Sequence, residues 1–200
     1  MTLAFDIFME EFNMTGSEKA DGYSRSAFTG LSEAEREIVF DLLVSELPWQ
    51  IKWLFFLDPK KAAFISRQKE AEQRGDRFAH VYMFQEQLVN QCGELVYQKH
   101  MINDYKNYVD YLKPSVLRAI VCTPTNSWTI NLFKEVILVE VDKKLVVIAS
   151  DYFLESTGFS RDIDENRILY NRLFSDLESE DTTRKVKAID YILKNKKKTY

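Results

Sequence analysis

Apolar residues recur at spacings of three and four along most of this chain, which is the pattern of a helix with one buried face. The segment after Ser32 is a clear case, because Ser32 and Glu35 have the spacing of a capping box at a helix start. The pattern therefore predicts an all-α fold. The residues expected to be buried on this helix are Ile38, Val39, Leu42, Leu43 and Leu47.

The rest of the N-terminal half is predicted to form irregular helical pairs. A short amphipathic helix is expected over residues 2–12, and a mobile loop over residues 14–29, where Gly and Ser gather. Residues 49–57 are apolar nearly all round, which is typical of a buried segment, although an aromatic patch for a partner is the alternative. Asp58 and Pro59 suit the start of the next helix, which should be peripheral.

A long apolar stripe follows from Phe78 to about Met101, and it includes Cys92 and Leu95. A shorter stripe covers residues 105–112, and one more helix is expected over residues 114–121. Residues 123–126, with the sequence Thr-Pro-Thr-Asn, are predicted to form a turn.

Two stretches of the C-terminal half share a sequence pattern at an offset of 39 residues. Each opens with Asp, places Ala seven residues later, continues with Asp-Tyr and closes with Leu. The opening residues, Asp142 and Asp181, can cap a helix by accepting hydrogen bonds from its first amides. Ala149 and Ala188 are small where a neighbouring helix must come close. Segments 130–141 and 165–177 are in place to be the partner helices.

These two stretches, Asp142–Leu154 and Asp181–Leu193, resemble the second helices of HEAT-like repeats. Val146 and Lys185 stand where such repeats commonly carry Arg, so only the second copy keeps the charge. The resemblance implies a short α-solenoid of antiparallel helix pairs.

A β-hairpin is the competing interpretation of residues 136–149, because two runs rich in β-branched residues flank Asp-Lys-Lys. That turn has neither Gly nor Asn, which tight hairpins prefer. Helical spacing also continues through Phe133, Ile137, Val141 and Leu145, so a helix is favoured.

The expected organisation is a single helical domain. It comprises an N-terminal helix and mobile loop (1–30), irregular helical pairs (31–125), two HEAT-like repeats (126–194) and a basic tail (195–200). The net charge is −4, and without Lys194, Lys196, Lys197 and Lys198 the balance is 23 positive against 31 negative residues, or −8. An acidic body of this kind disfavours general attraction to nucleic acid.

No recognised catalytic or metal-binding motif is found in the sequence. Cys92 and Cys122 are the only cysteines, and they are expected to be buried thiols in a reducing compartment. His80 and His100 lack partners at a metal-ligand spacing, so no metal, cofactor or catalytic residue is predicted. No secretion signal or membrane span is recognised, which makes a cytoplasmic location the expectation.

The function expected from these features is non-enzymatic protein binding. A small, acidic, cysteine-poor helical chain is similar in general character to bacterial immunity proteins, which bind and neutralise a cognate toxin. The partner would then be a protein, such as a basic toxin domain, and a scaffold or adaptor subunit fits the same features. The alternative is a HEAT-like nucleic-acid enzyme such as a DNA glycosylase, which would use Trp128, Tyr152 and Asp151.

Four carboxylates are the predicted partner-binding residues. If the second helices of successive pairs line one face, then Asp151, Glu155 and Asp190 lie on it, and Glu135 lies nearby. Carboxylates at such a surface would speed association with a basic partner.

Overall fold

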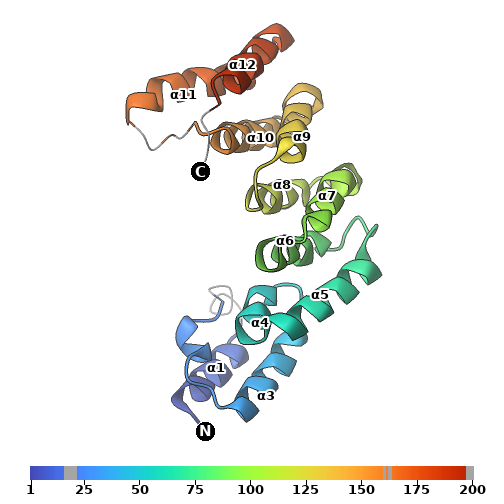
Figure 1. The fold of residues 1–200 in the computed structure, drawn as a ribbon, viewed down its shortest axis with the longest axis vertical. Helices are drawn as coiled ribbons and strands as arrows, with labels where there is room; N and C mark the ends of the chain where they lie inside the picture. The colour runs from blue at the N-terminus through green and yellow to red at the C-terminus, as the bar shows by residue number, and fades with distance from the viewer. Residues whose placement is uncertain (16–21, 160, 162–163, 197–200) are drawn as a thin grey trace. The chain divides into compact units, whose positions relative to one another are not determined.

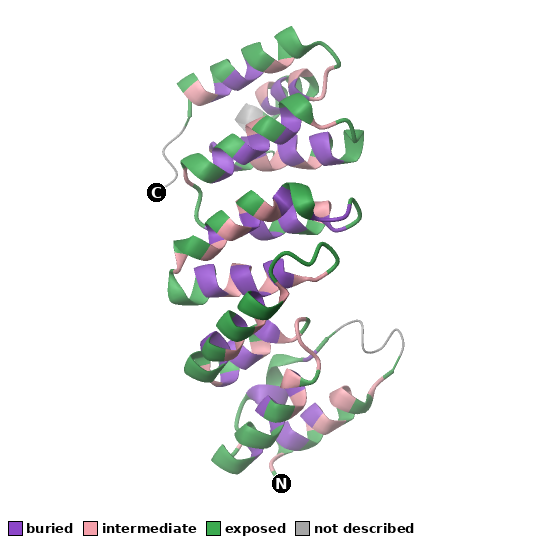
Figure 2. Cartoon of the chain, turned by 90° about the vertical axis from the view of Figure 1, so that its right-hand side faces the viewer, coloured by how far each residue is buried: buried purple, intermediate pink, exposed green. Residues whose placement is uncertain are grey.

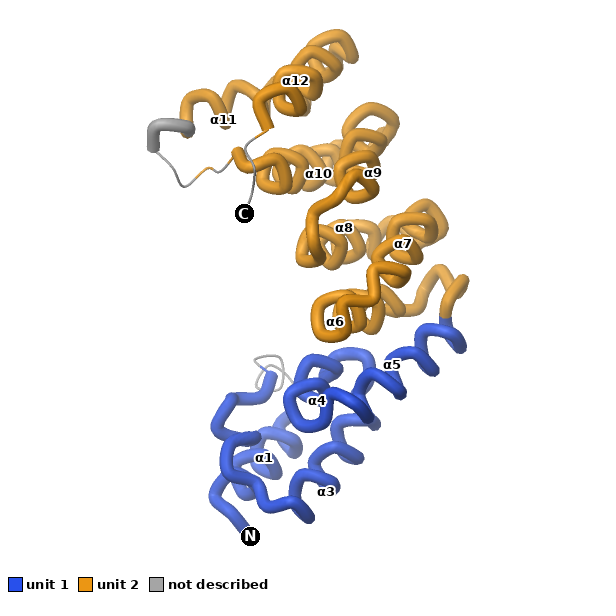
Figure 3. The backbone as a smooth tube through the Cα atoms, in the orientation of Figure 1, with its two compact units in different colours: residues 1–73 blue, residues 74–200 orange. Residues whose placement is uncertain are grey.

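The computed structural model describes residues 1–15, 22–159, 161 and 164–196, and these residues form α-helices and short 3₁₀ helices with no strand among them. The all-α prediction is therefore confirmed. The chain divides into two compact units, Met1–Gln73 and Arg74–Tyr200 (Figure 3). The division at residue 73 falls inside the segment 31–125, which the sequence pattern presented as one run of helical pairs.

The N-terminal unit is built from four α-helices and one 3₁₀ helix within its described residues (Figure 1). Helix α1 packs against η1 and α3, while α4 packs against α3 and α5. The bounds are α1 (Leu3–Asn13), η1 (Arg25–Phe28), α3 (Glu33–Val44), α4 (Ile51–Leu57) and α5 (Pro59–Gln73).

The Glu35 carboxylate connects the starts of α1 and α3. The main-chain N–H of Thr2 donates to it at 2.7 Å and that of Ser32 at 2.9 Å, and both hydroxyls donate at 2.9 Å. Thr2 is the N-cap of α1, and Ser32 is the N-cap of α3 in the predicted capping box. The main-chain donors of Ser32 and Thr2 favour the charged form and lower the pKa of Glu35 to about 2.

Glu35→Gln is expected to lower the melting temperature at neutral pH. It should also reduce the loss of melting temperature that the wild-type protein shows as the pH falls. The carboxylate has a pKa of about 2 when folded and an ordinary value of 4.5, so its contribution is complete above about pH 4.5 and is lost as the pH falls toward 2. Thermal unfolding followed across this range should show the two proteins converging in acid. The exposed Glu33 of the same turn supplies the control, Glu33→Gln. A deficit that stayed constant with pH would contradict this role.

Three expectations for the N-terminal unit need correction. The segment predicted as a mobile loop contains η1, and Tyr23, Ala27 and Phe28 are buried there; residues 16–21 of that prediction lie outside the described residues. Ile38 is half exposed, because α3 buries Val39, Phe40 and Leu43 instead. The segment 49–57 is buried only in part, since Trp49 and Phe56 reach the surface.

The C-terminal unit holds the remaining helices (Figure 1). The predicted turn before α9 and the predicted helix over residues 114–121 are both present. The bounds are α6 (Val81–Cys92), α7 (Leu95–Asp104), η2 (Tyr105–Asn107), α8 (Lys113–Val121), α9 (Ser127–Val139), α10 (Lys143–Ser156), α11 (Asp164–Leu177) and α12 (Thr182–Lys194).

The long stripe expected from Phe78 to Met101 is broken at Gly93. Gly93 has a φ of 71°, a left-handed conformation that ends α6, and its N–H donates to the Val89 carbonyl at 2.9 Å. The chain reverses there and α7 packs back on α6. Leu95, the first residue of α7, and Cys92, the last residue of α6, are exposed beside this break, while Phe78 lies before the start of α6 and is exposed there.

Both cysteines are exposed, which corrects the expectation of buried thiols. Cys92 ends α6 and Cys122 caps the C-terminus of α8, so each lies where a buried stripe has already ended.

Among the helices that the structure describes, none combines the length and the apolar character required to cross a bilayer.

The helices of the C-terminal unit pack in two rows. In one row, α6 contacts α8, α8 contacts α10 and α10 contacts α11. In the other row, α7 contacts α9 and α9 contacts α12. Figure 1 shows α7, α9 and α12 on one side of this unit, with α8, α10 and α11 on the other. The two helices that share the sequence pattern, α10 and α12, therefore belong to different rows.

The sequence pattern shared by α10 and α12 nevertheless predicts the starts of these two helices correctly. Asp142 caps α10 by accepting from the Lys144 N–H at 2.8 Å, and Asp181 caps α12 through the Thr183 N–H at 2.8 Å. Helices α9 and α11 occupy the segments predicted for their partners. The hairpin alternative for residues 136–149 is wrong, because α9 and α10 are helices joined by residues 140–142.

The core of the C-terminal unit runs between its helices, and Figure 2 shows buried residues recurring along them between exposed ones. Ala149 and Ala188 are both buried in this core. Lys185, the charged residue of the second copy, donates from Nζ to the Ile137 carbonyl at 2.6 Å, one of the last carbonyls of α9. This bond ties α12 to the end of α9.

Candidate functional site

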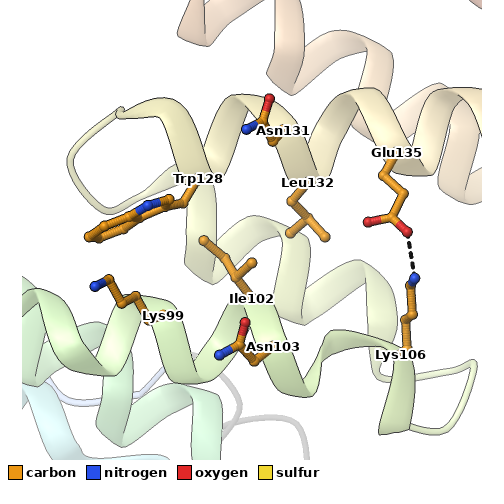
Figure 4. A pocket seen from close by; sticks show the side chains of 8 residues that line it. All are labelled: Lys99, Ile102, Asn103, Lys106, Trp128, Asn131, Leu132 and Glu135. Carbon is orange, nitrogen blue, oxygen red and sulfur yellow. Dashed lines mark hydrogen bonds and ion pairs between the residues drawn. The ribbon is translucent and has the colours of Figure 1, made fainter.

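An open groove lies between α7 and α9 in the described part of the C-terminal unit. It has a volume of about 430 Å³. Its floor is apolar and its sides are polar, and the side chains of the two helices face one another across it (Figure 4). The α7–α9 groove is defined by Lys99, Ile102, Asn103, Lys106, Trp128, Asn131, Leu132 and Glu135.

Trp128 and Lys99 form one end of the groove. The Lys99 Nζ lies 4.0 Å from the centre of the Trp128 ring, which is a cation–π contact. The Trp128 side chain is 38% exposed, so its ring remains open to a partner. The Lys99 ammonium has no carboxylate within ion-pair distance among the described residues, which leaves its charge uncompensated.

A buried glutamine positions this end. Gln98, fully buried on α7, donates from Nε2 to the Thr123 hydroxyl at 2.6 Å and to the Pro124 carbonyl at 2.8 Å. Its Oε1 accepts from the Asn126 side-chain amide. Asn126 in turn caps α9 by accepting from the Trp128 N–H at 2.9 Å. The start of α9, and Trp128 with it, is thereby fixed to α7 beside Lys99.

The other end of the groove carries compensated charge. Lys106, in the η2 turn that follows α7, forms an ion pair with Glu135 of α9 (Figure 4). Between the ends, Ile102 and Leu132 make the floor, with Asn103 on the α7 side and Asn131 on the α9 side. Neither of these two carboxamides hydrogen-bonds another side chain that the structure describes.

A second hollow of about 180 Å³ continues the groove past Glu135 toward the end of α9. It shares Lys106, Leu132 and Glu135 with the first and extends to Glu140. Tyr105 lines it and is buried, and its hydroxyl has no hydrogen-bond partner among the described residues. Burial, with the nearby carboxylates, raises the pKa of Tyr105, so the hydroxyl stays a donor.

The four predicted contact residues are not brought together on one row. Glu135 lies in the α7–α9 groove, where it is paired with Lys106. Asp151 is partly buried on α10 and accepts a hydrogen bond from the Tyr170 hydroxyl, so it holds α11 on α10. Glu155 is exposed on α10, whereas Asp190 is exposed on α12 in the other row. Burial and the bond to Asp151 raise the pKa of Tyr170.

The residues named for a glycosylase lie on two helices with separate contacts. Trp128 begins α9 in the groove, whereas Asp151 is held by Tyr170 and the Tyr152 ring packs 6.1 Å from that of Phe133. Groups of three or more His, Cys, Asp or Glu arranged to hold a metal ion do not occur in the described part of the chain.

Most of the groove was missed from the sequence, because its residues come from helices about 30 positions apart. Trp128 was singled out for other reasons, and Glu135 was named as a contact. The available signal was Asn126, whose place before an apolar run marks a helix start and therefore exposes Trp128 in its first turn. The chain matches no family model, and comparison with curated proteins and with solved structures gives no significant match.

Proposed function

We propose that this chain is a non-enzymatic protein-binding module. Its C-terminal unit is a short HEAT-like α-solenoid in this proposal, in which helix pairs stack to present an extended surface. The stacking of helices in two rows and the capping of both pattern copies by Asp support stacked helix pairs, with the two copies, α10 and α12, in different rows.

The observation that carries the binding function is the α7–α9 groove. It combines an exposed tryptophan, an apolar floor and two carboxamides that bond no other side chain in the described part of the chain. Tryptophan is among the residues that most often dominate the binding energy of protein interfaces, and a rigid frame lowers the entropic cost of binding. An open, shallow shape also suits a polypeptide better than an enclosed small molecule.

An immunity role in the cytoplasm is the specific version of this proposal that the sequence suggests. The exposed carboxylates Glu155 and Asp190 would meet the basic surface of a toxin domain, where opposite charge speeds encounter. Capture with the purified chain from cells that produce a candidate toxin would identify the partner.

Trp128→Ala is expected to weaken binding of the identified partner about 30-fold or more, which corresponds to a loss of at least about 2 kcal/mol for a central interface tryptophan. Isothermal titration calorimetry with the purified partner measures this change. Tyr111→Ala is the matched control, because Tyr111 is 68% exposed in the same unit and lies outside the groove.

Two outcomes would count against the proposal. Equal losses for Trp128→Ala and Tyr111→Ala would remove the groove from the interface. Retention of the wild-type chain on heparin at moderate salt, abolished by Lys99→Glu, would favour the nucleic-acid alternative, since phosphate contacts depend on salt.

A further inference from the structure

We propose that the occupant of the α7–α9 groove is an extended segment of the partner protein that places a carboxylate against Lys99. This inference rests on the proposed protein-binding function and names the chemistry that the groove recognises. It adds to the contacts proposed for Glu155 and Asp190, because a partner with a basic surface can also insert an acidic segment.

The charges within the groove favour a carboxylate at the Trp128 end. Lys106 is neutralised by Glu135, whereas Lys99 contacts the Trp128 ring and has no carboxylate partner among the described residues. A carboxylate on Lys99 would form a charge-assisted hydrogen bond, the stronger class in proteins. An apolar side chain next to it would contact the exposed Trp128 ring.

The dimensions suit a few residues of extended chain. Lys99 to Lys106 and Trp128 to Glu135 each span seven helical steps, or about 10 Å. At about 3.3 Å per extended residue the groove holds about three residues. Continuation to Glu140 gives about 18 Å along α9, which is room for about five residues.

The polar groups along the groove match a main chain. A carboxamide carries both a donor and an acceptor, as a peptide group does, so Asn103 and Asn131 can each bind one peptide group of the segment.

Nucleic acid fits these observations less well. Of the two lysines that line the groove, Lys106 is paired with Glu135, and Lys99 alone has no carboxylate partner among the described residues. The two lysines that line the continuation are already paired, Lys106 with Glu135 and Lys113 with Asp110. Affinity for a phosphate chain requires several free cations.

The test is selection from a random peptide library displayed on phage, with the purified full chain as bait. Wild type should enrich peptides that carry Asp or Glu next to an apolar residue, and Lys99→Glu should enrich Lys or Arg instead. For a synthetic acidic peptide from the selection, Lys99→Glu should weaken binding roughly tenfold to a hundredfold and Asn131→Ala roughly three- to tenfold. Lys144→Glu on α10 and Asn90→Ala on α6, both exposed and outside the groove, should leave affinity unchanged.

Three outcomes would overturn the inference. They are enrichment of the same charge by wild type and Lys99→Glu, absence of enriched peptides, and tighter binding of a fluorescent single-stranded thymidine oligonucleotide than of any peptide. If the partner is captured through Trp128 while no peptide is enriched, the protein-binding function stands and the extended segment is wrong. If no partner is captured and no peptide is enriched, both proposals fail.

Discussion

Phe133→Ala is expected to lower the free energy of unfolding of the C-terminal unit by about 3–5 kcal/mol. Phe133 is fully buried on α9, the helix that contacts α7, α10 and α12, and its ring lies 6.1 Å from that of Tyr152. Removing the ring leaves a cavity between several helices that cannot collapse together, so the lost contacts add to the lost hydrophobic burial.

Hydrogen exchange read by mass spectrometry is the appropriate measurement, because it reports on peptides of the C-terminal unit separately from those of residues 1–73. Leu138→Ala serves as the control, since Leu138 lies on the same helix but is 37% exposed. Leu138→Ala should reduce protection from hydrogen exchange clearly less than Phe133→Ala does. Equal losses of protection for the two variants would show that Phe133 is not at the centre of this core.

The helices and their starts were predictable because the signals are local. Ser32 with Glu35, Asp58 before Pro59, and the two aspartates of the repeated pattern each lie within a few residues of the amides that they cap. Capping depends on short-range geometry, so a single sequence is enough to identify it.

Which residues are exposed was less predictable, because a helix can bury a narrower face than its apolar residues suggest. Ile38 and Phe56 continue apolar patterns but are 50% and 41% exposed. The break at Gly93 was also missed, since a glycine inside an apolar stripe can either continue a helix or end it in a left-handed conformation.

The candidate site was the least predictable part. The groove needs α7 and α9 to lie side by side, and this follows from the path of the chain through α8. The buried Gln98 that fixes the start of α9 is an unremarkable residue in the sequence, and its role depends on reaching Asn126, 28 positions away. This arrangement depends on tertiary packing. Packing also places α12 in the row of α9, although the repeated sequence pattern suggested that α12 and α10 are equivalent.

Ala149→Leu is expected to lower the free energy of unfolding of the C-terminal unit by about 1–3 kcal/mol. Ala149 is fully buried on α10, which packs against α8, α9 and α11, so three added carbons would press on neighbouring helices. Leucine favours the helix about as well as alanine does, and therefore any loss reports on packing alone. Ala188→Leu should have a similar cost on α12, where Ala188 is 4% exposed.

The control for both substitutions is Val147→Leu on the same helix as Ala149, because Val147 is 41% exposed and can accept a larger side chain toward solvent. Urea denaturation followed by circular dichroism should place the midpoints of the two alanine variants well below that of Val147→Leu. Unchanged stability of Ala149→Leu would mean that α10 can move away from its neighbours at little cost. Unchanged stability of Ala188→Leu alone would show that the two copies of the pattern differ in packing as well as in row, and the HEAT-like proposal would lose its second repeat.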